Sequence, residues 1–223
     1  MRGARVVVAG AGGDLALAFL EALAEAGAEP ILVGRNAEAL TERADRFGAR
    51  SYVADLADPL STEALAEAVG PVDGAIHLAG AFAAAPVRAT DPALYHRMIE
   101  ANLSSLFFLA RALLPGLAER EGFLVGVSAA AGWNRGGRNL GAYAAAKAGV
   151  LALLGSIRAE EPRVRVLALV PMAAIDTPRN RRAMPEADPS KWIRPEALAR
   201  AALHALSLSG GRVFELPVYP PGA

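Results

Sequence analysis

The chain of 223 residues contains no cysteine and no glutamine, and lysine occurs only twice against 21 arginines. Without cysteine there is no disulfide and no thiolate ligand for a metal. The histidines, His77, His96 and His204, are too scattered for metal-ligand spacing, so no metal site is predicted. The formal net charge is zero, which argues against a general nucleic-acid-binding protein, because such a protein needs a basic face.

The N-terminal stretch is apolar and follows two arginines, as in a signal peptide. Gly10, Gly12, Gly13 and Asp14 break this stretch where a signal peptide would continue it. We expect no window of about 20 residues to be apolar enough to span a bilayer. A soluble, cytoplasmic protein without membrane partners is therefore predicted. The absence of cysteine and glutamine is typical of a heat-adapted organism, and a GC-rich genome produces the same bias.

Short runs of β-branched residues alternate with Ala- and Leu-rich helical stretches along the whole chain. The strand-like runs lack polar alternation, which is typical of a sheet covered on both faces. We predict an α/β single-domain Rossmann fold over residues 1–223, with a doubly wound, mostly parallel seven-stranded sheet and helices on both faces. Strands are expected at 5–9, 30–33, 51–53, 72–79, 123–127, 164–170 and 212–216, and helices at 15–26, 37–47, 62–69, 92–101, 103–119, 142–160 and 195–206.

A glycine-rich segment separates the first expected strand from the first expected helix. Its glycines fit the spacing Gly10-x-x-Gly13-x-x-Ala16, in which the backbone approaches a pyrophosphate at a helix N-terminus. The segment by itself is also consistent with a plain tight turn. Its position after the first strand favours a dinucleotide site, with cofactor-binding residues Gly10, Gly12, Gly13, Asp14 and Leu15.

Arg35 follows the second expected strand, where an acidic residue would bind the ribose 2′-hydroxyl of NAD(H). An arginine there accommodates a 2′-phosphate, so NADP(H) is predicted and NAD(H) is the alternative. Asp55 and Leu56 follow the third strand, near the expected position of the adenine. Ala79 and Gly80 follow the fourth strand and allow close backbone approach.

One of the two lysines, Lys147, follows Tyr143 by four residues in an Ala-rich helical stretch. Side chains at i and i+4 lie on the same face of a helix, so the phenol and the ammonium are neighbours. The positive charge is expected to lower the pKa of the phenol below its usual value. Taken alone, the two residues also fit a surface pair on an exposed helix.

Together these features resemble the short-chain dehydrogenase/reductase family over essentially the whole chain. The matching segments are the glycine-rich turn, Asp55-Leu56, Leu78 to Gly80, Asn102-Leu103, Tyr143 to Lys147, and Pro171 with Thr177. The irregular region 171–194 is long enough to be functional, and we expect it to be a substrate loop. Within it, residues 176–188 resemble the corresponding loop of dihydropteridine reductase.

The resemblance implies a role for each matching residue. Tyr143 is implied as the proton donor or acceptor, and Lys147 as its partner and a ligand of the nicotinamide ribose. Asn102 is implied to hold a relay water, although it also fits a helix kink or cap. Pro171 and Thr177 are implied at the cofactor, and Thr177 also fits a simple turn residue.

The position of the family's catalytic serine departs from the pattern. Counting 13 residues back from the tyrosine gives Ala130, and counting from Gly132 gives Ala129. Ser128 lies next to both, so it is a candidate catalytic residue or a strand-end serine that bonds the backbone. Dihydropteridine reductase also lacks this serine, but it has an acidic residue where this chain has Arg35.

We therefore expect an NADP(H)-dependent oxidoreductase that transfers hydride to a small carbonyl, quinonoid or imine-like substrate. The loop and the missing serine favour a dihydropteridine-like compound. The alternative is a non-catalytic dinucleotide sensor or scaffold, against which the intact Tyr143, Lys147 and Asn102 argue. The apolar helices at 103–119 and 142–160, together with the resemblance, predict a homodimer or homotetramer.

Overall fold

The structure is a computed structural model that describes residues 1–208 and 214–222. Within this part of the chain, seven strands form one sheet in the order β3-β2-β1-β4-β5-β6-β7, and every neighbouring pair is parallel. The strands are β1 Arg5–Ala9, β2 Glu29–Gly34, β3 Arg50–Val53, β4 Gly74–His77, β5 Phe123–Val127, β6 Arg165–Pro171 and β7 Glu215–Val218. The doubly wound α/β fold is confirmed, with a sheet that is parallel throughout.

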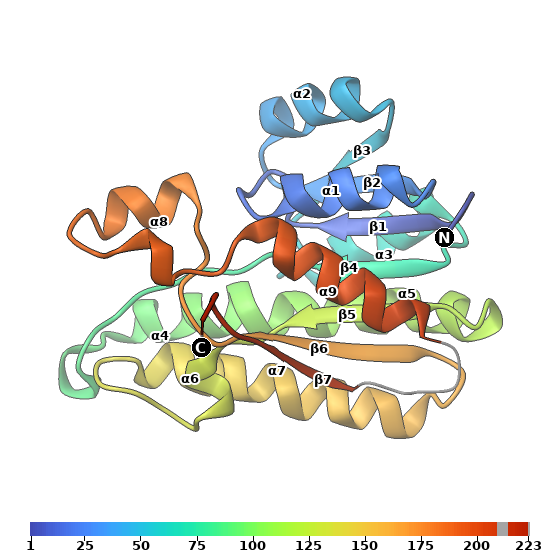
Figure 1. Ribbon diagram of the computed structural model, residues 1–223. Helices are drawn as coiled ribbons and strands as arrows, with labels where there is room; N and C mark the ends of the chain where they lie inside the picture. The colour runs from blue at the N-terminus through green and yellow to red at the C-terminus, as the bar shows by residue number, and fades with distance from the viewer. Residues whose placement is uncertain (209–213, 223) are drawn as a thin grey trace.

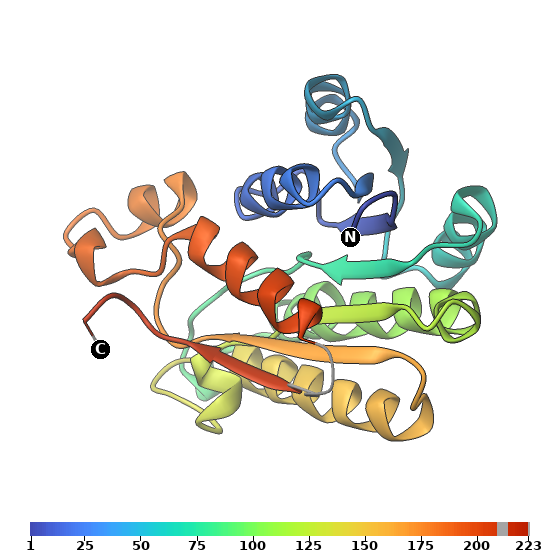
Figure 2. The same ribbon diagram turned by 45° about the vertical axis from the view of Figure 1, so that its right-hand side comes forward.

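Helices cover both faces of this sheet (Figures 1 and 2). The longer helices are α1 Ala16–Glu25, α2 Ala37–Phe47, α3 Pro59–Val69, α4 Pro92–Ile99, α5 Ser105–Glu119, α7 Gly141–Glu160 and α9 Pro195–Ser207. Shorter helices are α6 Ala130–Trp133 and α8 Pro178–Ala183, with 3₁₀ turns at Val87–Ala89 and Pro189–Lys191. The sequence patterns located the longer helices but none of these short segments, which are too short to show a periodicity.

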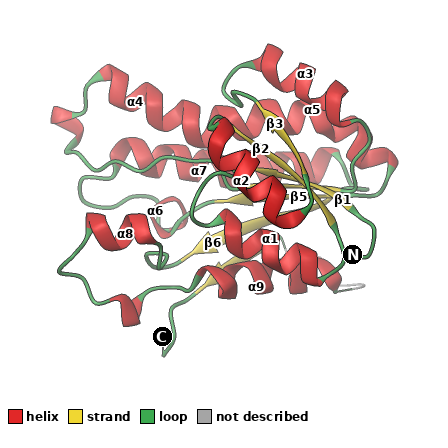
Figure 3. Cartoon of the chain, turned by 90° about the horizontal axis from the view of Figure 1, so that it is seen from above, coloured by secondary structure: helices red, strands yellow, loops and turns green. Residues whose placement is uncertain are grey.

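Successive residues of the buried strands alternate between two apolar cores. Val6 and Val8 of β1 pack with α1, α2 and α9, whereas Val7 and Ala9 pack with α3, α5 and α7. Both sides of each central strand are therefore buried, which explains why the strands show no polar alternation. Figure 3 shows α1 and α9 together on one side of the strands and α5 and α7 on the other.

The expected strand 72–79 is shorter in the structure, where β4 is Gly74–His77. Two expected helix boundaries are wrong for local reasons. The helix expected from residue 62 begins at Pro59, because Asp58 caps its N-terminus through Leu60 N and proline is tolerated in the first helical turn. The helices expected at 92–101 and 103–119 are joined by a π-helical turn, Glu100–Ser104. The expected strand 212–216 lies partly outside the described residues, and β7 occupies Glu215–Val218.

The continuous helical stretch Pro92–Glu119 is long and apolar enough to cross a membrane by length and composition. The expectation that no stretch reaches this threshold is therefore wrong. The core helix of a globular domain meets the same criterion, and in this fold Leu106, Leu109, Leu113 and Leu117 of α5 pack against the sheet.

The expected substrate loop leaves the sheet at the end of β6 and contains α8. Its two arms meet at a parallel bridge between Ile175 and Ile193, and Ile193 is fully buried. Beyond this neck, α8 projects past the edge at which the strands end (Figure 1). The loop is thus anchored at its base beside the edge where ligands of parallel α/β sheets bind.

Candidate active site

The strand order reverses between β1 and β4, and a cleft of about 570 Å³ opens beside the carboxyl ends of these strands. Such a reversal is the usual ligand site of an open α/β sheet. Eight of the expected cofactor residues line this cleft: Gly10, Gly12, Gly13, Arg35, Asp55, Leu56, Ala79 and Gly80. Asp14, Leu15, Pro171, Thr177, Tyr143 and Lys147 are not among its lining residues.

The glycine-rich turn packs closely on the segment after β4. Gly10 has a φ of +83°, and a Cβ built there would lie 2.5 Å from the backbone nitrogen of Ala79. Only glycine fits this position. Gly13 N donates to Gly10 O at 2.9 Å, whereas in the described chain the amides of Gly12 and Asp14 have no protein acceptor. The turn therefore leaves backbone donors beside a helix N-terminus, as an anionic ligand requires.

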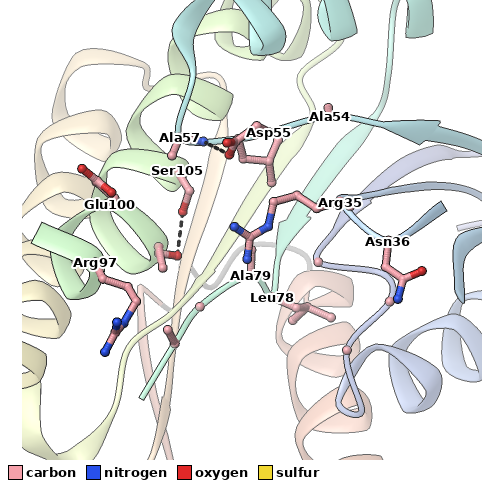
Figure 4. A pocket seen from close by; sticks show the side chains of 18 of the residues that line it. Arg35, Asn36, Ala54, Asp55, Ala57, Leu78, Ala79, Arg97, Glu100 and Ser105 are labelled. Carbon is pink, nitrogen blue, oxygen red and sulfur yellow. Dashed lines mark hydrogen bonds between the residues drawn. The ribbon is translucent and has the colours of Figure 1, made fainter. Parts of the chain in front are cut away.

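Arg35 and Asp55 reach the cleft from adjacent strands. Figure 4 shows the Arg35 guanidinium extending into the cleft toward Ala79, while the neighbouring Asn36 side chain turns away. Asn36 instead caps α2 by accepting from Ala39 N at 3.1 Å. Asp55 Oδ1 accepts from Ala57 N at 3.0 Å, so its carboxylate is held at the rim of the cleft. Arg35 is exposed and forms no ion pair in the part of the chain that the structure describes, so its charge is available to a ligand.

Three arginines near the cleft have no counterpart in the sequence-based prediction. Arg97 lines it from α4 and Arg179 from α8. Arg43, on α2, donates from Nη1 to the carbonyls of Ala11 and Gly13 in the glycine-rich turn. Among 21 arginines no local pattern marked these three, because their positions depend on contacts between distant segments.

Tyr143 and Lys147 lie one turn apart on α7, as expected, and the Lys147 Nζ is 5.9 Å from the centre of the Tyr143 ring. Lys147 is 6% exposed, and its Nζ donates to Val127 O at 2.8 Å. The Tyr143 ring also meets the edge of the exposed Phe82 ring, with centroids 5.0 Å apart. The pair is therefore a buried cation beside a half-buried phenol, and the surface-pair alternative does not describe it.

The expected lowering of the tyrosine pKa is not what this geometry produces. Burial raises the pKa of the Tyr143 phenol to about 12. Burial also lowers the pKa of the Lys147 ammonium to about 8. The expectation failed because Lys147 directs its charge to the carbonyl of Val127 and not to the phenol oxygen. In this state Tyr143 holds its proton across the neutral pH range, as a proton donor must.

Ser128 lies at the end of β5 and is only 2% exposed. Its hydroxyl donates to the carbonyl of Lys147 at 2.8 Å. This bond joins β5 to α7 and matches the strand-end alternative. The neighbouring Ala129 and Ala130 carry no donor, so neither count from the sequence places a hydroxyl opposite Tyr143.

Asn102 lies within the π-helical turn and is almost fully buried, with 1% exposure. Its Nδ2 donates to Met98 O and to Ala81 O, both at 2.9 Å. A Cβ at Gly80 would lie 2.7 Å from Asn102 Oδ1 and 3.6 Å from Lys147 Nζ. Because Gly80 has no side chain, Asn102 and Lys147 lie close behind this residue of the cleft lining. Single π-helical turns are frequent at functional sites.

A buried histidine lies behind this group. His77, the last residue of β4, is joined to Ser105 on α5 by a 3.0 Å bond between Nε2 and Oγ. Burial, with a smaller contribution from the charge of Lys147, lowers the pKa of the His77 imidazole to about 3. His77 is thus neutral and adds no second charge beside the lysine.

The base of the substrate loop places the last expected residues. Pro171 ends β6, and Thr177 caps α8 by accepting from Asn180 N at 3.2 Å. The cap matches the turn-residue alternative for Thr177, whose side chain is buried. Arg179 N donates to Asp14 Oδ2 at 3.2 Å, which links the loop to the glycine-rich turn.

Comparison with known proteins agrees with this architecture. The profile of the short chain dehydrogenase family matches residues 4–188. The chain belongs to the short-chain dehydrogenase/reductase family. It is 32% identical over 180 residues to galactitol 2-dehydrogenase (L-tagatose-forming) of Cereibacter sphaeroides, covering 76% of this chain and 70% of that protein. It is 29% identical over 162 residues to 2-keto-3-deoxy-L-fuconate dehydrogenase of Xanthomonas campestris, covering 72% of this chain but only 54% of that protein.

A solved short-chain dehydrogenase from Shigella flexneri, complexed with NADP, has 26% sequence identity and a TM-score of 0.88. The match covers 97% of both chains. The family membership makes the protein an oxidoreductase of the short-chain dehydrogenase/reductase type.

Proposed function

We propose that this protein is an NADPH-dependent reductase of a planar, strongly electrophilic small molecule, such as a quinonoid dihydropterin or another imine-like compound. The observation that carries the substrate class is the hydroxyl of Ser128, which donates to the Lys147 carbonyl and is therefore not free to donate to a substrate beside Tyr143. The resemblance of residues 176–188 to the dihydropteridine reductase loop supports the same class.

The residues of the cleft fit a dinucleotide. The Gly10 turn lies too close to Ala79 for any side chain, and the neighbouring amides of Gly12 and Asp14 have no protein acceptor in the described chain. These donors suit a pyrophosphate at the start of α1. Arg35 supplies a cation at the end of β2, where a ribose 2′-phosphate is recognised in this fold.

Each polar side chain near Tyr143 then has a separate role in the reaction. The bound NADPH supplies the hydride. Tyr143 gives its proton to the substrate atom that gains electron density. The ammonium of Lys147, 5.9 Å from the centre of the Tyr143 ring, favours the resulting phenolate through its charge and without a hydrogen bond to it. Asn102 fixes the backbone at Ala81 beside the lysine. We assign the catalytic roles to Tyr143, Lys147 and Asn102, and give Ser128 a supporting role.

The missing serine decides which substrates suit the site. An ordinary ketone needs donors for its developing oxyanion, and loss of one such donor costs about 3 kcal/mol of transition-state stabilisation in well-studied enzymes. A quinonoid or imine-like acceptor is already activated and depends less on that donor. The exposed aromatic face of Phe82 beside Tyr143 also suits a planar ring.

The proposal is tested by NADPH oxidation with three substrate classes: simple ketones, quinones and quinonoid dihydropterin. We expect the highest kcat/KM for an activated planar acceptor. In the same assay Ser128→Ala is expected to lower kcat by less than about tenfold, because its hydroxyl is bound to the α7 backbone.

A different result would redirect the proposal. A loss of about 10²-fold or more by Ser128→Ala on a ketone would show that the serine turns into the site, and would favour ordinary carbonyl reduction. Tight cofactor binding without turnover of any of the three classes would favour the alternative function, a dinucleotide sensor.

The preference for NADPH is expected to depend on Arg35. Arg35→Ala should raise the Kd of NADPH by about tenfold or more and leave the Kd of NADH nearly unchanged, because only NADPH carries the 2′-phosphate. Titration calorimetry with both cofactors measures this directly. Wild-type protein that binds NADH as tightly as NADPH would contradict the assignment.

Association into a homodimer or homotetramer remains a prediction. The exposed Phe107 on α5 is 46% exposed and contacts the neighbouring Phe108 ring, which is consistent with an apolar surface on this helix. Cytoplasmic location and heat adaptation likewise remain predictions from composition.

A further inference from the structure

Arg43 is the one side chain of the described residues that hydrogen-bonds the backbone of the glycine-rich turn. It lies on α2, and its Nη1 donates to Ala11 O and to Gly13 O, the latter at 2.6 Å. Arg43 does not line the cleft, whereas Gly12 and Gly13 do. The guanidinium therefore contacts the turn from the side that faces away from the cleft.

The geometry of the peptide bond gives this contact a consequence for ligand binding. The carbonyl of Ala11 shares a planar peptide with the amide of Gly12, and the carbonyl of Gly13 shares one with the amide of Asp14. In a trans peptide the C=O and N–H point in opposite directions. Carbonyls held toward Arg43 therefore direct the amides of Gly12 and Asp14 away from it, and these amides have no protein acceptor in the described chain.

Backbone bonds already tie parts of the turn: Gly10 N and Ala11 N donate to Val33 O, and Gly13 O accepts from Ala16 N at 3.2 Å. The carbonyl of Ala11 has no backbone donor in the described chain, so Arg43 supplies its hydrogen bond and adds a second one to Gly13 O. Glycine populates a wide range of φ and ψ, so Gly12 and Gly13 allow the two peptide planes to rotate. A charged guanidinium that bonds both flanking carbonyls restricts this rotation before any ligand arrives.

Arg43 also offsets a charge that opposes anion binding. Asp14 lies in the same turn, and its carboxylate would repel a pyrophosphate. Burial lowers the pKa of Arg43 from its ordinary value, while the nearby Asp14 and Glu42 favour its charged form. The guanidinium and the Asp14 carboxylate therefore interact favourably, which reduces the negative potential at the start of α1.

We propose that Arg43 is a positioning residue for the pyrophosphate of the cofactor, orienting the amides of Gly12 and Asp14 for NADPH and NADH alike. The inference rests on dinucleotide binding by this family and not on the NADPH preference. Arg35 and Arg43 then have separable roles, since Arg35 discriminates between the two cofactors and Arg43 serves both.

The test is titration calorimetry of the full chain with NADPH and with NADH. Arg43→Met should raise both Kd values by about tenfold or more, with their ratio unchanged. Arg43→Lys should recover part of the loss, because an ammonium can still donate to one of the carbonyls. The matched control is Arg46→Met, one turn further along α2, where Arg46 pairs with Glu21 at 2.7 Å and lies over the Phe47 ring, away from the glycine-rich turn. Both Kd values should stay at the wild-type level.

Each other outcome overturns the inference in a recognisable way. A loss confined to NADPH would place Arg43 at the 2′-phosphate. Unchanged Kd values, with or without a lower unfolding temperature of the ligand-free protein, would limit Arg43 to a structural contact. If Arg43→Met fails to fold, the Kd values of Arg43→Lys test the inference instead. Both NADPH and NADH should then bind several-fold more weakly than to the wild type. Wild-type protein that binds neither dinucleotide would remove the proposed function itself.

Discussion

Replacing Tyr143 by phenylalanine is expected to lower kcat by about 10²- to 10⁴-fold while the Kd of NADPH stays near the wild-type value. The phenol oxygen has no hydrogen-bond partner in the described chain, and the phenylalanine ring keeps the edge contact with Phe82. Folding should therefore be unaffected, so that only the transferred proton is lost. Because the pKa of Tyr143 is raised to about 12, the proton is present throughout the neutral range in the wild type.

Steady-state kinetics and calorimetry on the same preparations separate these effects. Tyr52→Phe is the matched control, since Tyr52 lies on β3 and its hydroxyl donates only to Ala68 O at 3.3 Å. It should retain turnover. More than about a tenth of wild-type kcat in Tyr143→Phe would rule out a general-acid role for the phenol.

Replacing Lys147 by methionine is expected to remove most turnover and yet leave the ligand-free protein at least as stable at neutral pH. Burial lowers the pKa of Lys147 to about 8, so the folded state carries a destabilised charge below that pH. Between about 8 and the ordinary 10.5, the unfolded chain binds a proton that the folded chain does not, so stability rises with pH in this window. Methionine has a similar length and carries no charge. Lys147→Met therefore removes the free-energy cost of burying the ammonium and the pH dependence of stability that follows from it. It also removes the hydrogen bond to Val127 O.

Calorimetric unfolding from neutral pH to pH 10 measures this effect, with activity and NADPH affinity determined in parallel. Lys191→Met is the control for stability, because the chain's other lysine is exposed and its removal should leave the unfolding temperature unchanged. A much lower unfolding temperature in Lys147→Met would show that the bond to Val127 outweighs the cost of burying the charge. The lysine would then be primarily structural.

The local pattern of this chain was sufficient for its architecture. Continuous apolar strands at β1, β2, β5 and β6 alternate with helical stretches, and only a parallel sheet covered on both faces buries such strands. The predicted helix 37–47 and strand 123–127 coincide with α2 and β5. The position of Gly10, Arg35, Asp55 and Gly80 beside one cleft follows in the same way, because residues that follow parallel strands meet at one edge of the sheet.

Other features of the site were beyond any local pattern. Whether Ser128 faces the substrate or the backbone depends on how far the carbonyl of Lys147 lies from it, and that distance is set by the packing of α7 on β5. The same packing gives Lys147 the carbonyl of Val127, which is why the predicted effect on the Tyr143 pKa was wrong. A helical spacing of four residues specifies neighbours on one face but not their partners on another element.

The sequence by itself therefore determined which residues stand at the ends of the strands and on one face of α7, since both follow from the periods of strand and helix. The tertiary structure alone decided what those residues contact. Burial and hydrogen-bond partners come from segments far apart in the chain, such as Ser128 with Lys147 and Arg43 with the carbonyls of Ala11 and Gly13. A polar group removed from water must find such partners, and their identity follows only when the elements pack together.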